Sequence, residues 1–200
     1  MRAILFASLL IFSFAQSGLA KTCNDDFLKS YAVTDETVFK PMRAQMSTKM
    51  SNGMEMESII LSVSKDHMMT QTISPPTPWT LIYDGSIFIS SDKGKAWTKI
   101  STMPKQVLDE KALAAKAEAI KKIGNEVCES VNLDGKQYTK ISADLDTSQS
   151  ASSKTNVAYY IEEESQEVTI IETKVETGGV TQLITQRIEY DASLTLPMPK

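Results

Sequence analysis

Five short turn sequences, each set between segments in which apolar and polar residues alternate, constrain the fold of this chain most strongly. They are Asn52-Gly53, Asp84-Gly85, Asp92-Lys93-Gly94, Asp134-Gly135 and Gly178-Gly179. Such sequences tolerate the left-handed backbone that a tight hairpin requires, and alternation with a period of two is typical of a half-buried strand. The pattern predicts strands joined by hairpins, and hence a mainly antiparallel sheet.

The alternating segments predict about ten or eleven strands, and two other segments predict helices. Strands are expected on both sides of Asn52-Gly53 and at about 67–74, 79–84, 86–91, 95–101, 126–132, 136–143, 155–162, 166–176 and 180–190. A short helical region is expected within 23–40, with Asn24-Asp25-Asp26 as its cap, and a long helix over 105–124. We therefore expect an α+β fold, in which helices cover the concave face of a curved antiparallel sheet.

The turn at Asn52-Gly53 decides whether the residues around it share a face of the sheet. A two-residue loop would pair Met50 with Glu55 and divide the even-numbered apolar residues between the two faces. A three-residue loop with Gly53 left-handed pairs Met50 with Met54 and keeps those residues on one face. We expect the second register, because it keeps charged side chains off the apolar face.

The first twenty residues have the three-part pattern of a secretory signal peptide. Met1-Arg2 is a cationic start, residues 4–15 are almost entirely apolar, and small residues precede a cut after Ala20. An uncleaved anchor is the alternative, but a run of about 12 residues is short for a bilayer core that needs about 20. We expect residues 1–20 to be removed, residues 21–200 to form a single exported domain, and no later segment to span a membrane.

Export makes a disulfide the expected state of the two cysteines, Cys23 and Cys128. Exported cysteine pairs usually oxidise, and two free thiols are the alternative. The bond would join the N-terminal region to the middle of the chain. The chain also contains no Asn-x-Ser/Thr sequence, which favours a bacterial periplasm over a eukaryotic secretory route.

Composition and motifs exclude several classes of function. With 21 basic against 25 acidic residues, the chain lacks the basic surface that binds nucleic acid. The single histidine, His67, is too few for a histidine-rich metal site, and the common nucleophile, phosphate-loop and zinc-protease motifs are absent. The acidic run at 162–164 is typical of a solvated turn. We expect no enzymatic activity, no cofactor, no metal and no nucleic-acid partner.

Methionine is concentrated in one part of the chain, where seven of the ten lie between residues 42 and 69. Its flexible, polarizable side chain suits surfaces that accept varied partners, but it also fills ordinary cores. An adaptable apolar groove for acyl chains and plain core packing therefore both remain open. A Cu(I) site at His67-Met68-Met69 is a third interpretation, which is disfavoured because adjacent strand residues point to opposite faces.

Residues 75–100 combine a strand that ends in Asp84-Gly85, a following strand with Phe88, and a turn at Gly94 before Trp97. This arrangement resembles the central hairpins of the LolA-like superfamily of periplasmic lipoprotein carriers. The closing segment 187–197, Arg-Ile-Glu-Tyr-Asp-Ala-Ser-Leu-Thr-Leu-Pro, resembles the last strand and the apolar tail of that superfamily. The order of elements agrees over nearly the whole of residues 21–200.

The resemblance implies a half-open β-barrel with a helical lid over an apolar cavity. Members of this superfamily carry lipoprotein acyl chains, bind other lipids or sense envelope stress, and true carriers hold the lid with an arginine, for which Arg43 is the nearest candidate. We expect a periplasmic, monomeric, non-catalytic carrier or sensor of lipid or acylated lipoprotein. The alternative is an envelope protein-interaction module with a filled core. The residues expected to line the cavity are Met46, Met50, Met54, Met56, Ile60, Trp79, Leu81, Leu108 and Leu113.

Overall fold

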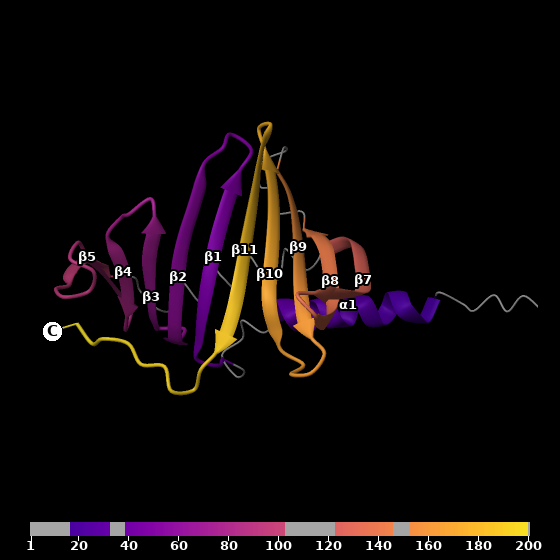
Figure 1. The fold of residues 1–200 in the computed structure, drawn as a ribbon, viewed down its shortest axis with the longest axis horizontal. Helices are drawn as coiled ribbons and strands as arrows, with labels where there is room; N and C mark the ends of the chain where they lie inside the picture. The colour runs from indigo at the N-terminus through magenta and orange to yellow at the C-terminus, as the bar shows by residue number, and fades with distance from the viewer. Residues whose placement is uncertain (1–16, 33–38, 103–122, 146–152, 200) are drawn as a thin grey trace, which may run out of the picture.

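One antiparallel sheet of eleven strands makes up most of the structure, a computed structural model that describes residues 17–32, 39–102, 123–145 and 153–199. Its elements are α1 (Ser17–Ala32), β1 (Met42–Met50), β2 (Glu55–Ser64), β3 (His67–Ser74), β4 (Trp79–Tyr83), β5 (Ser86–Ser90), β6 (Thr98–Thr102), β7 (Ile123–Leu133), β8 (Lys136–Leu145), β9 (Ser153–Glu162), β10 (Val168–Thr177) and β11 (Val180–Tyr190). The strand order is β6-β5-β4-β3-β2-β1-β11-β10-β9-β8-β7 (Figure 1). The sheet is therefore open, with β6 and β7 at its edges.

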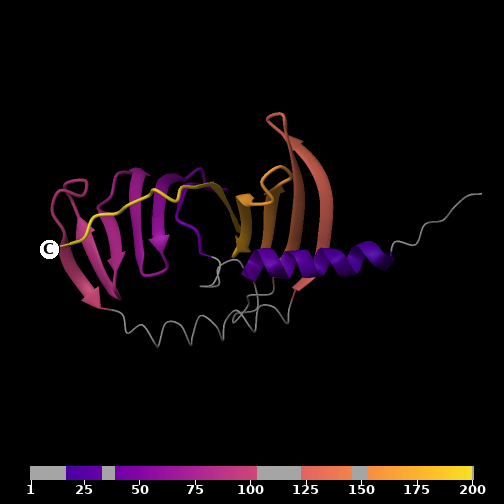
Figure 2. The same ribbon diagram turned by 90° about the horizontal axis from the view of Figure 1, so that it is seen from below.

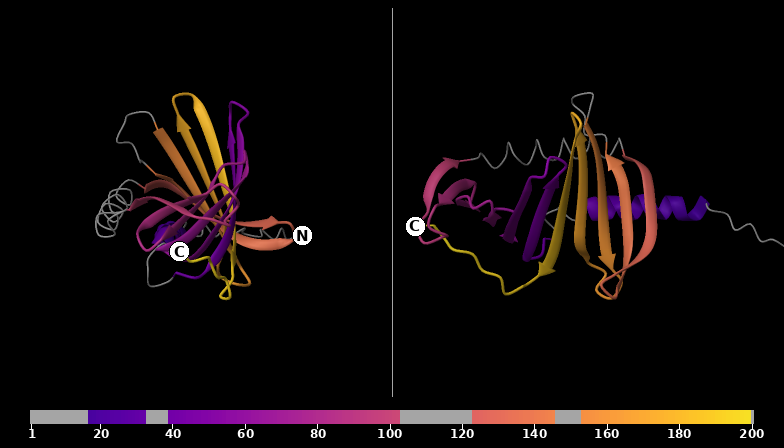
Figure 3. Two further views of the ribbon diagram at one scale, coloured as in Figure 1. Left: turned by 90° about the vertical axis from the view of Figure 1, so that its left-hand side faces the viewer. Right: turned by 45° about the horizontal axis from the view of Figure 1, so that its top comes forward.

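The turns between strands adopt the backbone that their residues favour. The two central residues of three hairpins, Asp84-Gly85, Asp134-Gly135 and Gly178-Gly179, all have positive φ angles. This combination defines the tight turn whose twist matches that of paired strands. The hairpins are thus built locally, and among the strand pairs of the described residues only that of β1 with β11 joins distant parts of the chain. The sheet twists and curls strongly along its length, as Figure 3 shows.

Helix α1 lies across one half of the sheet, beside β7, β8 and β9 (Figure 2). Phe27 is fully buried, and its ring meets that of Tyr159 edge-on at a centroid distance of 5.5 Å. The core around it consists of Cys23, Phe27, Ile141, Ala143, Leu145, Val157, Tyr159 and Val168. The expected disulfide is confirmed, because Cys23 is bonded to Cys128 and so fastens α1 to the edge strand β7.

The expectation of an α+β fold with helices covering the sheet is wrong. The described residues form one large sheet with a single helix, and this helix reaches only part of it. At about 1.5 Å per residue, its 16 residues span about 24 Å, the width of about five strands. The long helix expected over 105–124 lies outside the described residues, except that Ile123 and Gly124 begin β7.

The start of α1 also differs from the expectation. The helix begins at Ser17 and runs through the predicted cleavage point after Ala20. Asn24, Asp25 and Asp26 therefore lie inside the helix and do not cap it, because the chain ahead of them is itself helical. No helix in the described part of the chain is long and apolar enough to span a membrane.

The C-terminal segment after β11 runs past the ends of the strands toward β5 (Figure 1). His67 donates a hydrogen bond through Nε2 to the carbonyl oxygen of Pro197 at 3.1 Å. The hydroxyl of Tyr83 donates to the sulfur of Met198 at 3.6 Å. These contacts hold the last residues against β3 and β4. His67 and Pro197 are 130 positions apart in the sequence.

Asp144 joins three neighbouring strands through its carboxylate. It accepts hydrogen bonds of 2.8 Å from the amides of Asn125 on β7 and Asn156 on β9. These bonds favour the charged form and lower the pKa of Asp144 below its usual value. The stabilisation is therefore present at neutral pH and is lost as the pH falls through the folded-state pKa, below about 4.

We expect Asp144→Asn to lower the free energy of unfolding at pH 7 by less than about 1 kcal/mol, since this carboxylate is exposed to solvent. At pH 2 the variant and the parent should be equally stable, because the parent carboxylate is then protonated. Urea unfolding at the two pH values measures both. Asp134→Asn, in the β7–β8 turn, controls for the loss of one negative charge. A stability difference that is the same at pH 7 and pH 2 would contradict the prediction.

Candidate functional site

A single row of directly paired residues shows which side chains share a face of the sheet. From β3 to β7 the row is Thr72, Ser58, Met46, Gln186, Ile171, Tyr159, Ile141 and Cys128. Directly paired residues point to the same side of a sheet. Because Tyr159 and Ile141 pack with Phe27 of α1, the whole row lies on the face that α1 covers. We call this the helix-side face, and the opposite one the far face.

The β1–β2 hairpin brings its methionines onto the helix-side face. Met50 N donates to Met54 O and Gly53 N donates to Met50 O, both at 2.9 Å, and Gly53 has a φ of +86°. The three-residue loop and the register expected from the sequence are therefore confirmed. We define the methionine face as the set Met42, Met46, Met50, Met54, Met56 and Ile60, all of which share this face.

The methionine face is only partly buried. Met54 is 51% exposed and Met56 is 36% exposed, whereas Met46 is half-buried. Its apolar surface continues onto β11, where Ile188 pairs with Ala44 and Ile184 pairs with Thr48. Sequence reasoning missed this extension. The alternation within β11 was visible, but nothing local indicates that β11 pairs with β1.

Two of the predicted cavity residues lie on the other side of the sheet. Leu81 pairs with Met69, which pairs with Leu61, and this row faces away from the methionine face. Trp79 is two residues from Leu81 and shares the far face. Leu81 is fully buried there and belongs to the packing of the far side. Leu108 and Leu113 lie outside the described residues.

The other candidates from the sequence are also separated by the sheet. Met68 pairs with Ser62 on the helix-side face, whereas His67 pairs with Tyr83 on the far face. The segment His67-Met68-Met69 therefore cannot hold one copper ion with all three side chains. Arg43 lies on the far face, as its odd number predicted, opposite Glu189. Among the described residues, no three His, Cys, Asp or Glu side chains gather as metal ligands would.

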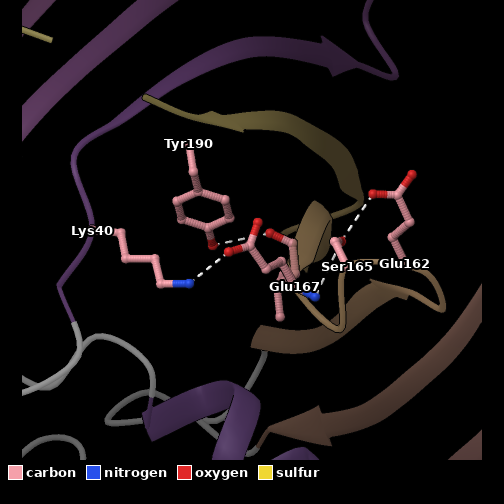
Figure 4. A network of polar contacts seen from close by, with 6 residues as sticks. Lys40, Glu162, Ser165, Glu167 and Tyr190 are labelled. Carbon is pink, nitrogen blue, oxygen red and sulfur yellow. Dashed lines mark hydrogen bonds and ion pairs between the residues drawn. The ribbon is translucent and has the colours of Figure 1, made fainter. Parts of the chain in front are cut away.

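The end of the methionine face near Met42 is polar. Tyr190, paired with Met42, donates its hydroxyl to the carbonyl of Val168 at 3.1 Å (Figure 4). Lys40 forms a 2.6 Å ion pair with Glu167 and lies 5.6 Å from the centre of the Tyr190 ring. Burial, and next the charge of Glu167, raise the pKa of Tyr190, so its hydroxyl stays neutral and can donate. This network joins the segment before β1 to the β9–β10 hairpin.

The opposite end of the methionine face, near Met54, is apolar and exposed. The tips of the β1–β2 and β10–β11 hairpins are joined, because Ser51 N donates to Thr181 O at 2.8 Å and Thr181 N donates to Ser51 Oγ at 3.1 Å. Val180 is 43% exposed at this rim, on the same face as Met54. The face therefore has one apolar end and one charged end.

Comparison with solved structures finds distant matches that cover most of this chain. One match is the LolA superfamily protein NE2245 from Nitrosomonas europaea, with 9% identity, 89% of this chain and 94% of that chain covered, and a TM-score of 0.35. Another is the hypothetical lipoprotein YmcC from Escherichia coli, with 6% identity, 82% and 96% covered, and a TM-score of 0.35. No family model and no curated protein matches the sequence.

Proposed function

We propose that this chain is an exported, non-catalytic carrier or sensor that binds the acyl chains of lipids or lipoproteins on its methionine face. The observation that carries the proposal is the register of the first hairpin, which gathers five methionines on one side of the sheet. Two of them, Met54 and Met56, remain exposed. Flexible thioether side chains adapt to ligands of varied shape, and each buried methylene of a bound chain contributes about 0.8 kcal/mol.

The disulfide and the two ends of the face also support this proposal. A formed disulfide is typical of an oxidising compartment outside the cytosol, as export requires. The exposed apolar rim at Met54 and Val180 offers a chain a path onto the face, and the charged network around Lys40 limits how far it can extend. This polarity suits an amphiphile, whose apolar part seeks the thioethers and whose polar part seeks water.

We expect Met46→Glu to weaken acyl-chain binding by about tenfold or more, because a carboxylate in an apolar contact loses its hydration without a compensating partner. Displacement of the fluorescent probe 1-N-phenylnaphthylamine from purified protein measures the affinity. Native mass spectrometry of the protein as isolated detects any lipid that co-purifies. Gln45→Glu is the matched control, since it adds the same charge one residue away on the far face and should leave binding unchanged.

Equal loss of binding in Met46→Glu and Gln45→Glu would contradict the proposal, because the effect would then depend on charge and not on the face. Absence of both co-purified lipid and probe binding would contradict it as well.

The competing function is an envelope protein-interaction module, which the exposed side chains of Met54 and Val180 also favour, since apolar groups at a rim can contact proteins. It predicts a protein partner that is lost in Met54→Glu, with no bound lipid.

A further inference from the structure

Ser58 of β2 is a buried hydroxyl that lacks a hydrogen-bond partner in the described part of the chain. The residue is 6% exposed, and its Oγ atom is closed off from solvent. Buried hydroxyl groups are normally hydrogen-bonded, because leaving one unpaired costs free energy. An exception within a candidate binding face therefore needs an explanation.

Ser58 lies in the middle of the methionine face. Met46 is directly opposite on β1, and Met56 and Ile60 are its neighbours on the same side of β2. The missing partner is not a general property of this strand. Ser62, four residues along on the same face and 2% exposed, donates its hydroxyl to the carbonyl oxygen of Ser64 at 3.2 Å. Ser58 is therefore a hydrogen-bond donor that lies among apolar side chains and whose hydroxyl is not used by the described residues.

The chemistry around Ser58 specifies what it could bind. A hydroxyl hydrogen is a donor, so its partner must offer an acceptor oxygen. The row that contains Ser58 continues with Thr72 on one side and with Met46 and Gln186 on the other, none of which is positively charged. A carboxylate would be costly here without a cation, whereas a neutral carbonyl would not.

We infer that Ser58 Oγ donates a hydrogen bond to the carbonyl oxygen of an acyl ester, so that the methionine face selects esterified acyl chains over plain hydrocarbon or free fatty acid. This inference rests on the proposed function, because it assumes that an acyl chain occupies the face. The ligand reaches the hydroxyl by displacing a neighbouring thioether such as Met46, whose three rotatable bonds allow this movement.

A matched pair of ligands tests the inference. Methyl palmitate carries the carbonyl, and octadecane is a chain of similar length with no acceptor oxygen; each competes with 1-N-phenylnaphthylamine for the purified protein. We expect the parent protein to bind the ester about five- to tenfold more tightly than the hydrocarbon, the contribution of one buried hydrogen bond. Ser58→Ala should abolish this preference by weakening the ester alone, and Ser62→Ala should keep it.

The outcomes separate this inference from the function on which it rests. If both ligands compete equally in the parent protein, or if Ser58→Ala retains the preference for the ester, the inference is wrong while acyl binding stands. If neither ligand displaces the probe, the proposed function fails and the inference fails with it. The mass of a co-purified ligand adds a second readout: a phospholipid whose acyl chains are esters supports the inference, and a ligand without an ester contradicts it.

Discussion

Removal of the Cys23–Cys128 disulfide should lower the free energy of unfolding by about 2–5 kcal/mol, the range found for native disulfides of exported domains. The bond joins residues separated by 105 positions, and closing so long a loop removes much of the conformational freedom of the unfolded chain. Cys23→Ala combined with Cys128→Ser is the appropriate variant, because Cys23 is buried and Cys128 is exposed. Urea unfolding of the variant and the parent measures the difference.

The same loss should follow from reduction of the parent protein with a dithiol. The reductant should not affect the variant, which serves as the control for other effects of the reagent. Hydrogen exchange should show that amides of α1 lose protection before those of β1 and β11, because the bond fastens α1 to an edge strand. Equal unfolding midpoints for the oxidised and reduced parent protein would refute this prediction.

Phe27→Ala should destabilise the protein by about 3–5 kcal/mol, the usual cost of deleting a large aromatic ring from a core. The side chain is fully buried and lies between Tyr31, stacked at 6.2 Å, and Tyr159, edge-on at 5.5 Å. Both neighbours belong to elements that the ring holds together, so a cavity here also weakens the docking of α1. Thermal or urea unfolding of the variant tests the magnitude.

Lys29→Ala is the matched control on the same helix. Lys29 is exposed and forms a 3.3 Å ion pair with Asp26 on the surface, so its removal should change stability by less than about 1 kcal/mol. Combining Phe27→Ala with the cysteine replacements gives a second test. The combined loss should be smaller than the sum of the separate losses, because both act on the docking of α1. Strict additivity would show that the ring and the disulfide stabilise the fold independently.

The strands and their faces could be predicted closely from the sequence, because both depend on neighbouring residues. The alternation of β2 and the left-handed Gly53 together specify the first hairpin, and Asp84-Gly85 and Asp134-Gly135 do the same for others. The part of the sheet that helix α1 covers could not be predicted in this way. How far α1 extends, and which strands it reaches, depends on packing at Phe27 between distant segments.

The residues of the candidate site also differ in whether their face of the sheet could be predicted from neighbouring residues. The methionines of the first hairpin were correctly assigned to one face, since their phase is fixed within a few residues of Gly53. The face of Trp79 and Leu81 could not be predicted, because β4 is connected to β1 through two further strands and a shift of one residue moves a side chain to the opposite face. The burial of Ser58 could not be predicted, because a serine between methionines is typical of an exposed strand position, whereas this one is buried.

From the sequence alone one can predict the antiparallel hairpins, which side chains of a strand share a face, and the pair of cysteines available for a bond. Each of these follows from local backbone preference or from residue chemistry. Three features are seen only in the folded molecule: β11 pairs with β1, α1 lies over one half of the shared face, and in the other half the Ser58 hydroxyl is buried with no partner among the described residues. The first two depend on contacts between residues more than a hundred positions apart, and the third depends on how side chains pack over the paired strands.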